Sequence, residues 1–295
     1  MHEPLRVEAR DGFPLAADLF LPDAAPRAAV LIAPAMGVPR GYYAAFAGHL
    51  AREGLAALTL DYRGIGGSRA GALRGFRCAL HEWAEKDLAA ALDALAGRLP
   101  GAPILWVGHS VGGQLFGLVD DPRVHAALLV AAQSGHWRHW PGAGRLGMLA
   151  WWWAVVPALV PLFGRLPGAV FGGGEDVPAG VAREWAAWGR HPDYALSYAR
   201  PRGGLGFARF AGRLRSYAVA DDGFAPVPTV EALLRCWEGA RSELRVVRPR
   251  DVGERTIGHF GFFRPRFGPT LWSEASRWLL EAADGAAAGA PPRAP

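Results

Sequence analysis

Ser110 lies in a sequence pattern that can make a serine nucleophilic. It is the central residue of a G-x-S-x-G pentapeptide at residues 108–112, directly after an apolar run at 104–107 and before a helix expected from Gln114. A serine on such a sharp strand-to-helix turn has a strained backbone, and its hydroxyl projects from the sheet edge. The amino terminus of the following helix favours developing negative charge. The pattern therefore predicts nucleophilic catalysis by Ser110; an ordinary turn serine is the alternative.

The elements that must position this serine alternate between strands and helices. The predicted strands are 28–32, 55–60, 104–107, 126–131, 213–220 and 244–247, after a hairpin at 6–21, and the predicted helices are 42–53, 82–99, 114–119, 230–238 and 271–283. Apolar strands that alternate with helices indicate βαβ units. We therefore expect an α/β fold with a mostly parallel sheet, in a single domain over residues 1–284. The Ala/Gly/Pro-rich residues 285–295 have nothing to bury and are expected to form a disordered tail.

The alternation stops over about residues 136–207, a stretch too long for an ordinary loop. It is aromatic, punctuated by Pro and Gly, and helical where it is regular, so we expect a helical cap inserted into the domain. Residues 146–164 carry no charged side chain and are long enough to cross a bilayer. Because Pro157 and Pro161 interrupt them, we interpret the segment as an apolar lid over an apolar site rather than a transmembrane helix. Contact with a membrane surface is the intermediate interpretation and is not favoured.

The composition is that of a globular protein and excludes several classes. Hydrophobic residues make up 51% of the 295 residues, which is enough for a large core. The net charge of +5 comes from scattered arginines rather than a basic cluster, which argues against nucleic acid as a partner. Cys78 and Cys236 have no metal-like or redox spacing and suit a reducing compartment. The first ten residues have no apolar core like that of a signal peptide, so we expect a cytoplasmic protein.

Three motifs make the chain similar to the α/β-hydrolase family, especially to bacterial hydrolases that share them. They are Gly-His-Ser-Val-Gly-Gly at 108–113, Phe-Gly-Gly-Gly-Glu-Asp at 171–176 and Gly-His-Phe-Gly-Phe-Phe at 258–263, and the resemblance covers about residues 5–283. The pattern D-x-R-G-x-G-x-S at 61–68 also matches the family, where this loop is mostly architectural. The resemblance implies an esterase-like or lipase-like serine hydrolase.

In this family the nucleophile, the acid and the histidine follow one another along the chain. Of the nine histidines, His259 is the one that follows residue 222, in an expected loop where the family has its base. An imidazole there can take the serine proton near neutral pH; a surface loop histidine is the alternative. Asp221 and Asp222 both follow the strand 213–220, and the family's Asp-x-x-x-Pro spacing favours Asp222. Asp222 would fix the tautomer of His259 and stabilise the imidazolium, while Asp221 shapes the turn.

The oxyanion that forms when a serine attacks a carbonyl needs two main-chain N–H donors. The first is expected at Val111, directly after the nucleophile. The second should come from the loop after the strand 28–32, where the chain has Ala-Pro at 33–34 instead of the family's common His-Gly pair. Proline cannot donate, so the second donor is Ala35 or Met36, and the sequence does not separate these two.

Other chemistries find little support. His136, His139 and His191 lie in the predicted cap without an accompanying cysteine and with few carboxylates, so we interpret them as surface histidines and expect no metal. The chain has no phosphate-binding or dinucleotide-binding fingerprint, so no cofactor is expected.

The sequence therefore predicts hydrolysis of a carboxylic ester with an apolar acyl or aromatic group. An acyltransferase or an aminopeptidase of the same fold, and a hydrolase-like protein that binds a small ligand, are the alternatives. The oligomeric state is left open.

Overall fold

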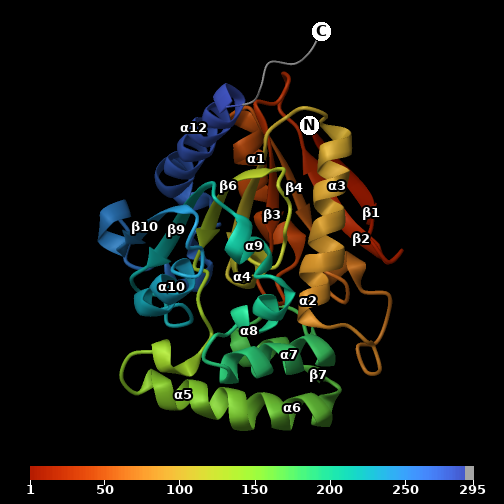
Figure 1. Cartoon of the computed structure of the whole chain (residues 1–295), viewed down its shortest axis with the longest axis vertical. Helices are drawn as coiled ribbons and strands as arrows, with labels where there is room; N and C mark the ends of the chain where they lie inside the picture. Colours follow the sequence, from red (N-terminus) through yellow and green to blue (C-terminus); the bar gives the residue numbers. More distant parts are fainter. Residues whose placement is uncertain (290–295) are drawn as a thin grey trace.

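The computed structural model describes residues 1–289 and places them around one eight-stranded sheet (Figure 1). The strands are β1 (His2–Glu8), β2 (Pro14–Phe20), β3 (Ala28–Ala33), β4 (Leu55–Leu60), β5 (Ile104–His109), β6 (Val124–Val130), β9 (Arg213–Val219) and β10 (Arg241–Val247). Their order across the sheet is β1-β2-β4-β3-β5-β6-β9-β10. β2 pairs antiparallel with β1 and β4, and the other pairs in this sheet are parallel. The predicted α/β fold with a mostly parallel sheet is confirmed.

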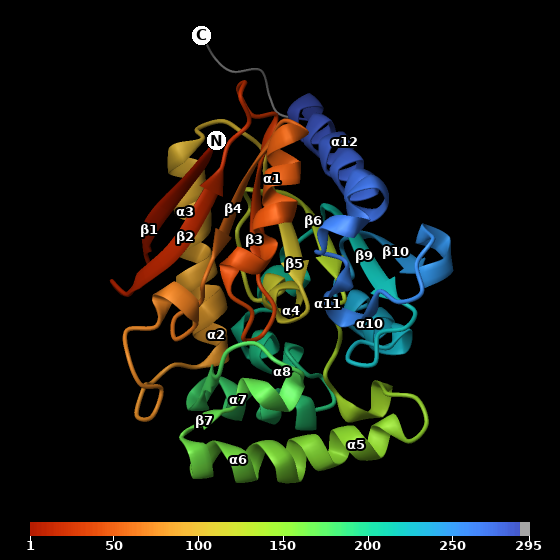
Figure 2. The same ribbon diagram turned by 180° about the vertical axis from the view of Figure 1, so that it is seen from behind.

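Helices cover both faces of this sheet, which explains why its central strands read as continuous apolar runs (Figures 1 and 2). α1 (Ala44–Arg52) and α12 (Ser273–Gly289) contribute side chains to one core, and α4 (Val111–Phe116) to the other. A continuous helix over Leu80–Arg98 contributes side chains to the same core as α4. It comprises α2 (Leu80–Glu82), a π-helical segment (Trp83–Leu88) and α3 (Ala89–Arg98). Every residue of β3 and β4 is buried. Alternate side chains of each strand therefore enter opposite cores.

Residues 136–210, which we call the cap, form a helical layer at one end of the sheet (Figures 1 and 2). Its outer helix runs from α5 (Gly144–Ala150) through a π-helical turn (Trp151–Val155) into α6 (Val156–Phe163). α7 (Ala179–Arg190) lies between the outer helix and the sheet. The remaining strands and α-helices of the cap are β7 (Arg165–Leu166), β8 (Val177–Pro178), α8 (Leu196–Ala199) and α9 (Leu205–Arg209).

The prolines that we expected to interrupt the outer helix do not break it. In the π-helical turn the Val156 N–H donates to the Trp151 carbonyl, so the next donor in that register would be Pro157, which has no N–H. The carbonyl of Trp152 instead accepts a hydrogen bond of 2.8 Å from the guanidinium of Arg190 on α7. A side chain of the inner cap helix therefore satisfies the backbone group that the proline leaves free.

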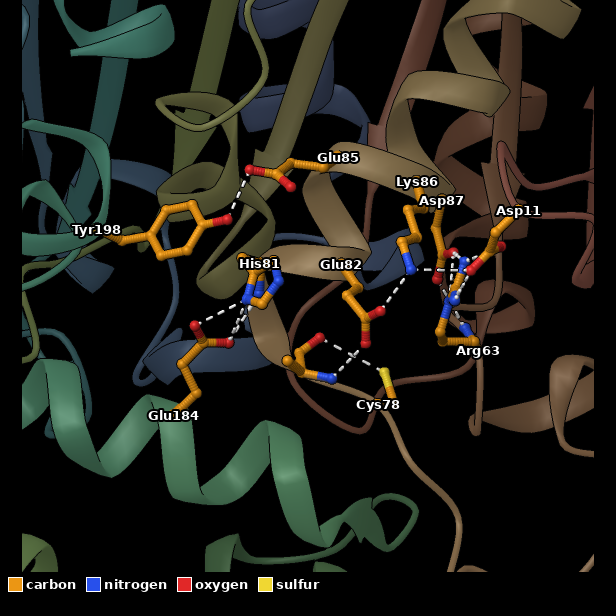
Figure 3. Close-up of polar contacts among 11 residues, drawn as sticks. Asp11, Arg63, Cys78, His81, Glu82, Glu85, Lys86, Asp87, Glu184 and Tyr198 are labelled. Carbon is orange, nitrogen blue, oxygen red and sulfur yellow. Dashed lines mark hydrogen bonds and ion pairs between the residues drawn. The ribbon is translucent and has the colours of Figure 1, made fainter. Parts of the chain in front are cut away.

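Two polar contacts join the cap to the helix Leu80–Arg98 (Figure 3). Nδ1 of His81 lies 2.8 Å from the Glu184 carboxylate, which also accepts the His81 main-chain N–H at 3.0 Å. The Tyr198 hydroxyl donates to Glu85 at 2.7 Å, and the Tyr198 ring stacks on His81 with centroids 4.8 Å apart. The hydrogen bond that His81 donates to the Glu184 carboxylate raises the pKa of His81 above its usual value. At this contact, α2 and α7 are therefore held together most strongly when His81 is protonated.

This contact predicts a pH-dependent stability. Because the folded-state pKa of His81 is raised, its contribution is complete below the usual histidine value of 6.5 and is lost as the pH rises through the folded-state pKa. We expect the free energy of unfolding to fall by about 1 kcal/mol or less across that interval, since both groups are partly exposed. Urea unfolding at several pH values measures this fall in the free energy of unfolding. His81→Gln should make the free energy of unfolding less dependent on pH over the same interval. A wild-type profile that is unchanged by His81→Gln would contradict the assignment.

Several elements differ in their boundaries from those expected, and two differences concern the last helix and the segment of His259. The last helix, α12, continues through Gly289, so residues 285–289 are helical and not part of a disordered tail. The alanines at 286–288 explain this, because alanine has the highest intrinsic helix propensity. Residues 290–295 of the predicted tail lie outside the described residues. His259 lies in a short helix, α11 (Gly258–Gly261), rather than in an open loop.

Candidate active site

Ser110 sits at a strained turn between β5 and α4. Its backbone has φ 51° and ψ −114°, a conformation that residues other than glycine rarely adopt. The turn is tight because glycines flank it: a Cβ atom on Gly108 would lie 2.6 Å from Gly113, and one on Gly112 would lie 2.1 Å from the carbonyl oxygen of Ala33. The Ser110 N–H donates to the Val130 carbonyl at 2.9 Å and ties the turn to β6. The pentapeptide thus adopts the strand-turn-helix geometry that the sequence predicts.

His259 and Asp222 form a buried pair near this turn. Nδ1 of His259 lies 2.7 Å from Oδ2 of Asp222, whose side chain is fully buried. The other carboxylate oxygen of Asp222 accepts the main-chain N–H groups of Phe224 at 2.8 Å and Ala225 at 2.9 Å. These bonds fix the carboxylate, so Nδ1 carries the proton that it shares with Asp222 and Nε2 is left as the basic nitrogen. Ser110 and His259 both line one cavity.

Asp221 bonds to the backbone of the segment that carries His259. Its carboxylate accepts the N–H of Ile257 at 2.9 Å and that of Gly258 at 3.2 Å. Gly258 has φ 64°, a left-handed conformation that favours glycine at the start of α11. The two neighbouring acids therefore have different partners: Asp222 contacts the imidazole itself, and Asp221 contacts the chain that carries it.

The structure separates the two candidates for the second oxyanion donor. The N–H of Ala35 already donates to the hydroxyl of Tyr43 at 2.8 Å. Ala35, one of the two expected donors to the oxyanion, is therefore replaced by Met36 in this role. For the N–H groups of Met36 and Val111, no acceptor is found among residues 1–289, and both residues line the cavity with Ser110. Met36 is therefore the available donor in this loop, beside Val111.

The motif at 171–176 supports the loop that carries Met36. The Glu175 N–H donates to the Gly37 carbonyl at 2.7 Å, directly after Met36. The Glu175 carboxylate accepts the N–H of Gly66 at 2.8 Å. A Cβ atom on Gly37 would lie 2.7 Å from the Glu175 carbonyl oxygen, so that position requires glycine. Glu175 thus joins the cap to the two loops that follow β3 and β4, a role that sequence reasoning missed.

Tyr43 and His109 connect the loop after β3 to His259. Nε2 of His109 lies 3.0 Å from the carbonyl oxygen of His259, and because a carbonyl can only accept, Nε2 carries the proton. Nδ1 of His109 therefore accepts from the Tyr43 hydroxyl at 2.9 Å, and that hydroxyl accepts from the Ala35 N–H. Burial lowers the pKa of His109 well below its usual value and keeps it neutral. The result is a one-directional hydrogen-bond chain from Ala35 to the backbone of His259.

Removing the hydroxyl of Tyr43 should break this chain. Tyr43→Phe leaves the Ala35 N–H and Nδ1 of His109 buried without partners, so we expect a loss of about 2 kcal/mol or more in the free energy of unfolding. Turnover should fall about tenfold or less, because the hydroxyl touches no reacting atom. Urea unfolding and kcat measurements check both. Tyr62→Phe is the matched control, since the Tyr62 hydroxyl donates at 3.1 Å to a single carbonyl, that of Pro34. Equal losses in the two variants would contradict the chain.

One of the three cap histidines is placed differently from expectation, whereas His191 is exposed as predicted. His136 is buried against Trp137 and His139 rather than at the surface, and burial lowers its pKa. Nδ1 of His139 lies 3.0 Å from the Ser134 hydroxyl. Within residues 1–289, no group of three or more His, Cys, Asp or Glu side chains is arranged to hold a metal ion.

Comparisons with known proteins address the fold and its family. A family model described as serine aminopeptidase, S33, matches residues 24–166, which include Ser110 and end before Asp222 and His259. No curated protein matches the chain. A soluble variant of monoglyceride lipase from Saccharomyces cerevisiae, solved with a substrate analogue, is similar over 96% of this chain and 95% of that chain. The identity is 16% and the TM-score 0.68.

Two further solved structures have the same architecture. Est1E from Butyrivibrio proteoclasticus, bound to ferulic acid, matches over 95% of this chain and 99% of that chain, with 16% identity and a TM-score of 0.63. An esterase from Pyrococcus furiosus matches over 95% and 91%, with 15% identity and a TM-score of 0.61. The chain has the α/β-hydrolase fold that these structures share. At these identities the structural likeness concerns the fold.

The cavity that Ser110 and His259 line lies between the sheet and the cap. Its volume is about 290 Å³, and residues from both layers line it. Besides the serine and histidine, the lining includes the aromatic residues Trp140, Trp151, Trp152, Phe171, Trp185, Phe224 and Phe260. The lining contains no carboxylate, lysine or arginine among the described residues. The cavity therefore suits an uncharged group with apolar or aromatic surface.

A second hydrogen-bond chain joins the cap to the turn at residues 222–225. The Trp185 indole donates to the Tyr194 hydroxyl, which donates to Gln114, and both contacts measure 2.8 Å. Gln114 donates to Gln133 at 3.2 Å, and Gln133 donates to the Phe224 carbonyl at 3.2 Å. Gln114 directly follows the glycines of the serine motif, but its sequence position gave no sign of these partners. The chain fixes one wall of the cavity relative to the turn that holds Asp222.

Proposed function

We propose that this protein is a serine hydrolase that cleaves carboxylic esters with an apolar acyl or aromatic group. The observation that carries the proposal is the joint placement of three features: the strained Ser110 turn, the basic Nε2 of His259 fixed by Asp222, and an aromatic cavity that both Ser110 and His259 line. Each feature is needed for acyl transfer by an activated serine.

The reaction proceeds through an acyl-enzyme. Nε2 of His259 accepts the Ser110 proton as Oγ attacks the ester carbonyl, and the oxyanion accepts hydrogen bonds from the N–H groups of Val111 and Met36. The protonated His259, stabilised by Asp222, gives its proton to the leaving alcohol when the ester C–O bond breaks. Water then loses a proton to His259 and attacks the acyl carbonyl, and the proton returns to Ser110 when the acid leaves.

The cavity lining favours an ester over a peptide. An aminopeptidase has to bind the charged amino terminus of its substrate, and a buried ammonium needs a paired charge or several acceptors. The lining offers the aromatic rings named above and the single amide side chain of Gln133. A volume of about 290 Å³ is at the small end of ligand cavities, so we propose a short acyl chain or a single aromatic ring as the preferred group.

Labelling with a fluorophosphonate probe tests the activated serine. The wild-type protein should become covalently labelled, and Ser110→Ala should not, while circular dichroism shows that both are folded. A labelled wild type is then assayed with p-nitrophenyl esters of increasing chain length and with an aminoacyl p-nitroanilide. Absence of labelling and of ester turnover in folded wild-type protein would favour a ligand-binding protein. Faster product formation with added alcohol acceptors would identify a transferase.

A further inference from the structure

The outer cap helix exposes apolar surface where a soluble protein normally has polar residues. The helix Gly144–Phe163 spans 20 residues; its most apolar 18-residue window has a mean hydropathy of 1.8, yet only 17% of that window is buried. The side chains of Leu146, Trp153 and Leu162 are 69%, 49% and 67% exposed. Within residues 1–286, every strongly exposed large apolar side chain other than Met1 and Phe224 lies in residues 146–170. This concentration marks a docking face rather than scattered surface residues.

One stripe of the same helix packs into the cap. Trp152, Val156 and Val160 are buried at successive turns, and the Trp152 indole donates to the Gly135 carbonyl at 2.9 Å. Figures 1 and 2 show the helix along the outer edge of the molecule, with α7 between it and the sheet. If the helix spanned a bilayer, these three buried side chains would lose their contacts with the rest of the cap. The geometry therefore fits a helix that lies along an interface with one face inward and one face outward.

The charges around this face are positive. The outer helix contains no Asp or Glu. Arg138 and Arg145 are exposed at its amino-terminal end, and Arg74 is exposed at the other end, where it donates to the Leu162 carbonyl at 3.1 Å. For these three arginines no carboxylate partner is found within residues 1–289. Guanidinium groups beside an apolar helix complement anionic lipid headgroups.

We propose that the outer face of the helix Gly144–Phe163, which we call the docking face, binds the surface of an anionic lipid bilayer. The apolar side chains enter the boundary between headgroups and acyl chains, and the arginines contact the headgroups. A second copy of the chain fits this face less well. Two such helices paired antiparallel across a two-fold axis would place Arg145 of one copy beside Arg74 of the other, which opposes like charges.

Docking would place the cavity beside the lipid. Gly147, Met148 and Trp151 of the outer helix also line the cavity, so one helix separates the bilayer surface from Ser110. If the proposed ester hydrolysis holds, an apolar ester reaches the cavity from the bilayer without crossing water. The membrane contact itself does not depend on that activity.

Sedimentation with vesicles tests the docking face on the full chain. We expect wild-type protein to sediment with vesicles of equal parts phosphatidylcholine and phosphatidylglycerol, and about tenfold more weakly with phosphatidylcholine alone. The variant Leu146→Gln/Trp153→Gln/Leu162→Gln should lose about tenfold or more in vesicle affinity, because its apolar anchors are gone. These three residues do not line the cavity, so hydrolysis of a water-soluble acetyl ester should be unchanged.

Two matched charge variants sharpen the result. Arg138→Gln/Arg145→Gln should weaken binding to anionic vesicles, whereas Arg52→Gln/Arg277→Gln, on exposed positions of α1 and α12, should not. Wild-type protein that stays in the supernatant with both vesicle types overturns the proposal, as does equal binding by wild type and the triple variant. Dimerisation that the triple variant abolishes, without vesicle binding, overturns it in favour of a second copy. Vesicle binding as expected without ester turnover leaves this proposal standing while the proposed function fails.

Discussion

Replacing Asp222 by Asn should lower kcat for a p-nitrophenyl ester by about 10⁴-fold with little loss of stability. The amide cannot stabilise the imidazolium, and if its NH₂ group faces Nδ1 it favours the wrong tautomer of His259. The carboxamide keeps an oxygen for the N–H groups of Phe224 and Ala225, so the turn should persist. Steady-state kinetics together with thermal unfolding measures both effects.

Asp221→Asn is the matched control, because the two acids are neighbours with different partners. The Asp221 carboxylate contacts the backbone of Ile257 and Gly258 rather than the imidazole. Loss of one of these hydrogen bonds should cost about 1 kcal/mol of stability and tenfold or less in kcat. A larger loss of kcat in Asp221→Asn than in Asp222→Asn would contradict the assignment of the acid.

Gly112→Ala should destabilise the fold and remove activity together. The new Cβ atom would lie 2.1 Å from the carbonyl oxygen of Ala33, which is a backbone atom and cannot turn aside. We expect a loss of about 3 kcal/mol in the free energy of unfolding. The β3 loop and α4 would have to move apart, which separates the N–H groups of Met36 and Val111 and should cost about 10²-fold or more in kcat.

Gly97→Ala is the control for a glycine with free space. Gly97 lies in α3, and a Cβ atom there would meet nothing within 4 Å. This substitution should raise the free energy of unfolding by about 0.5 kcal/mol or more and leave kcat unchanged. Urea unfolding measures the stability of both variants, and fluorophosphonate labelling tests whether Ser110 is still reactive in each. A Gly112→Ala protein with wild-type labelling would show that the close approach of the two loops is not required.

The sequence by itself determined the features that depend on local pattern. The apolar runs around 28–32, 55–60 and 104–107 are strands because both sheet faces are covered, and this gives them a hydrophobic signature that is read without neighbours. The serine pentapeptide adopts its strained turn because glycines stand where the chain must approach itself closely. His259 could be singled out by its order along the chain.

Only the tertiary structure decided which polar groups meet. Ala35 and Met36 are equally good candidates for the second oxyanion donor from sequence alone. In the structure the N–H of Ala35 donates to the hydroxyl of Tyr43, on a neighbouring turn. The partners of Asp221 lie 36 and 37 residues further along the chain. Likewise, hydropathy marks the outer cap helix as apolar but not whether its surface is covered or exposed. The physical reason is the same in each case: a hydrogen bond or a buried face depends on groups that folding brings together, and those groups leave no mark on the residues beside it in sequence.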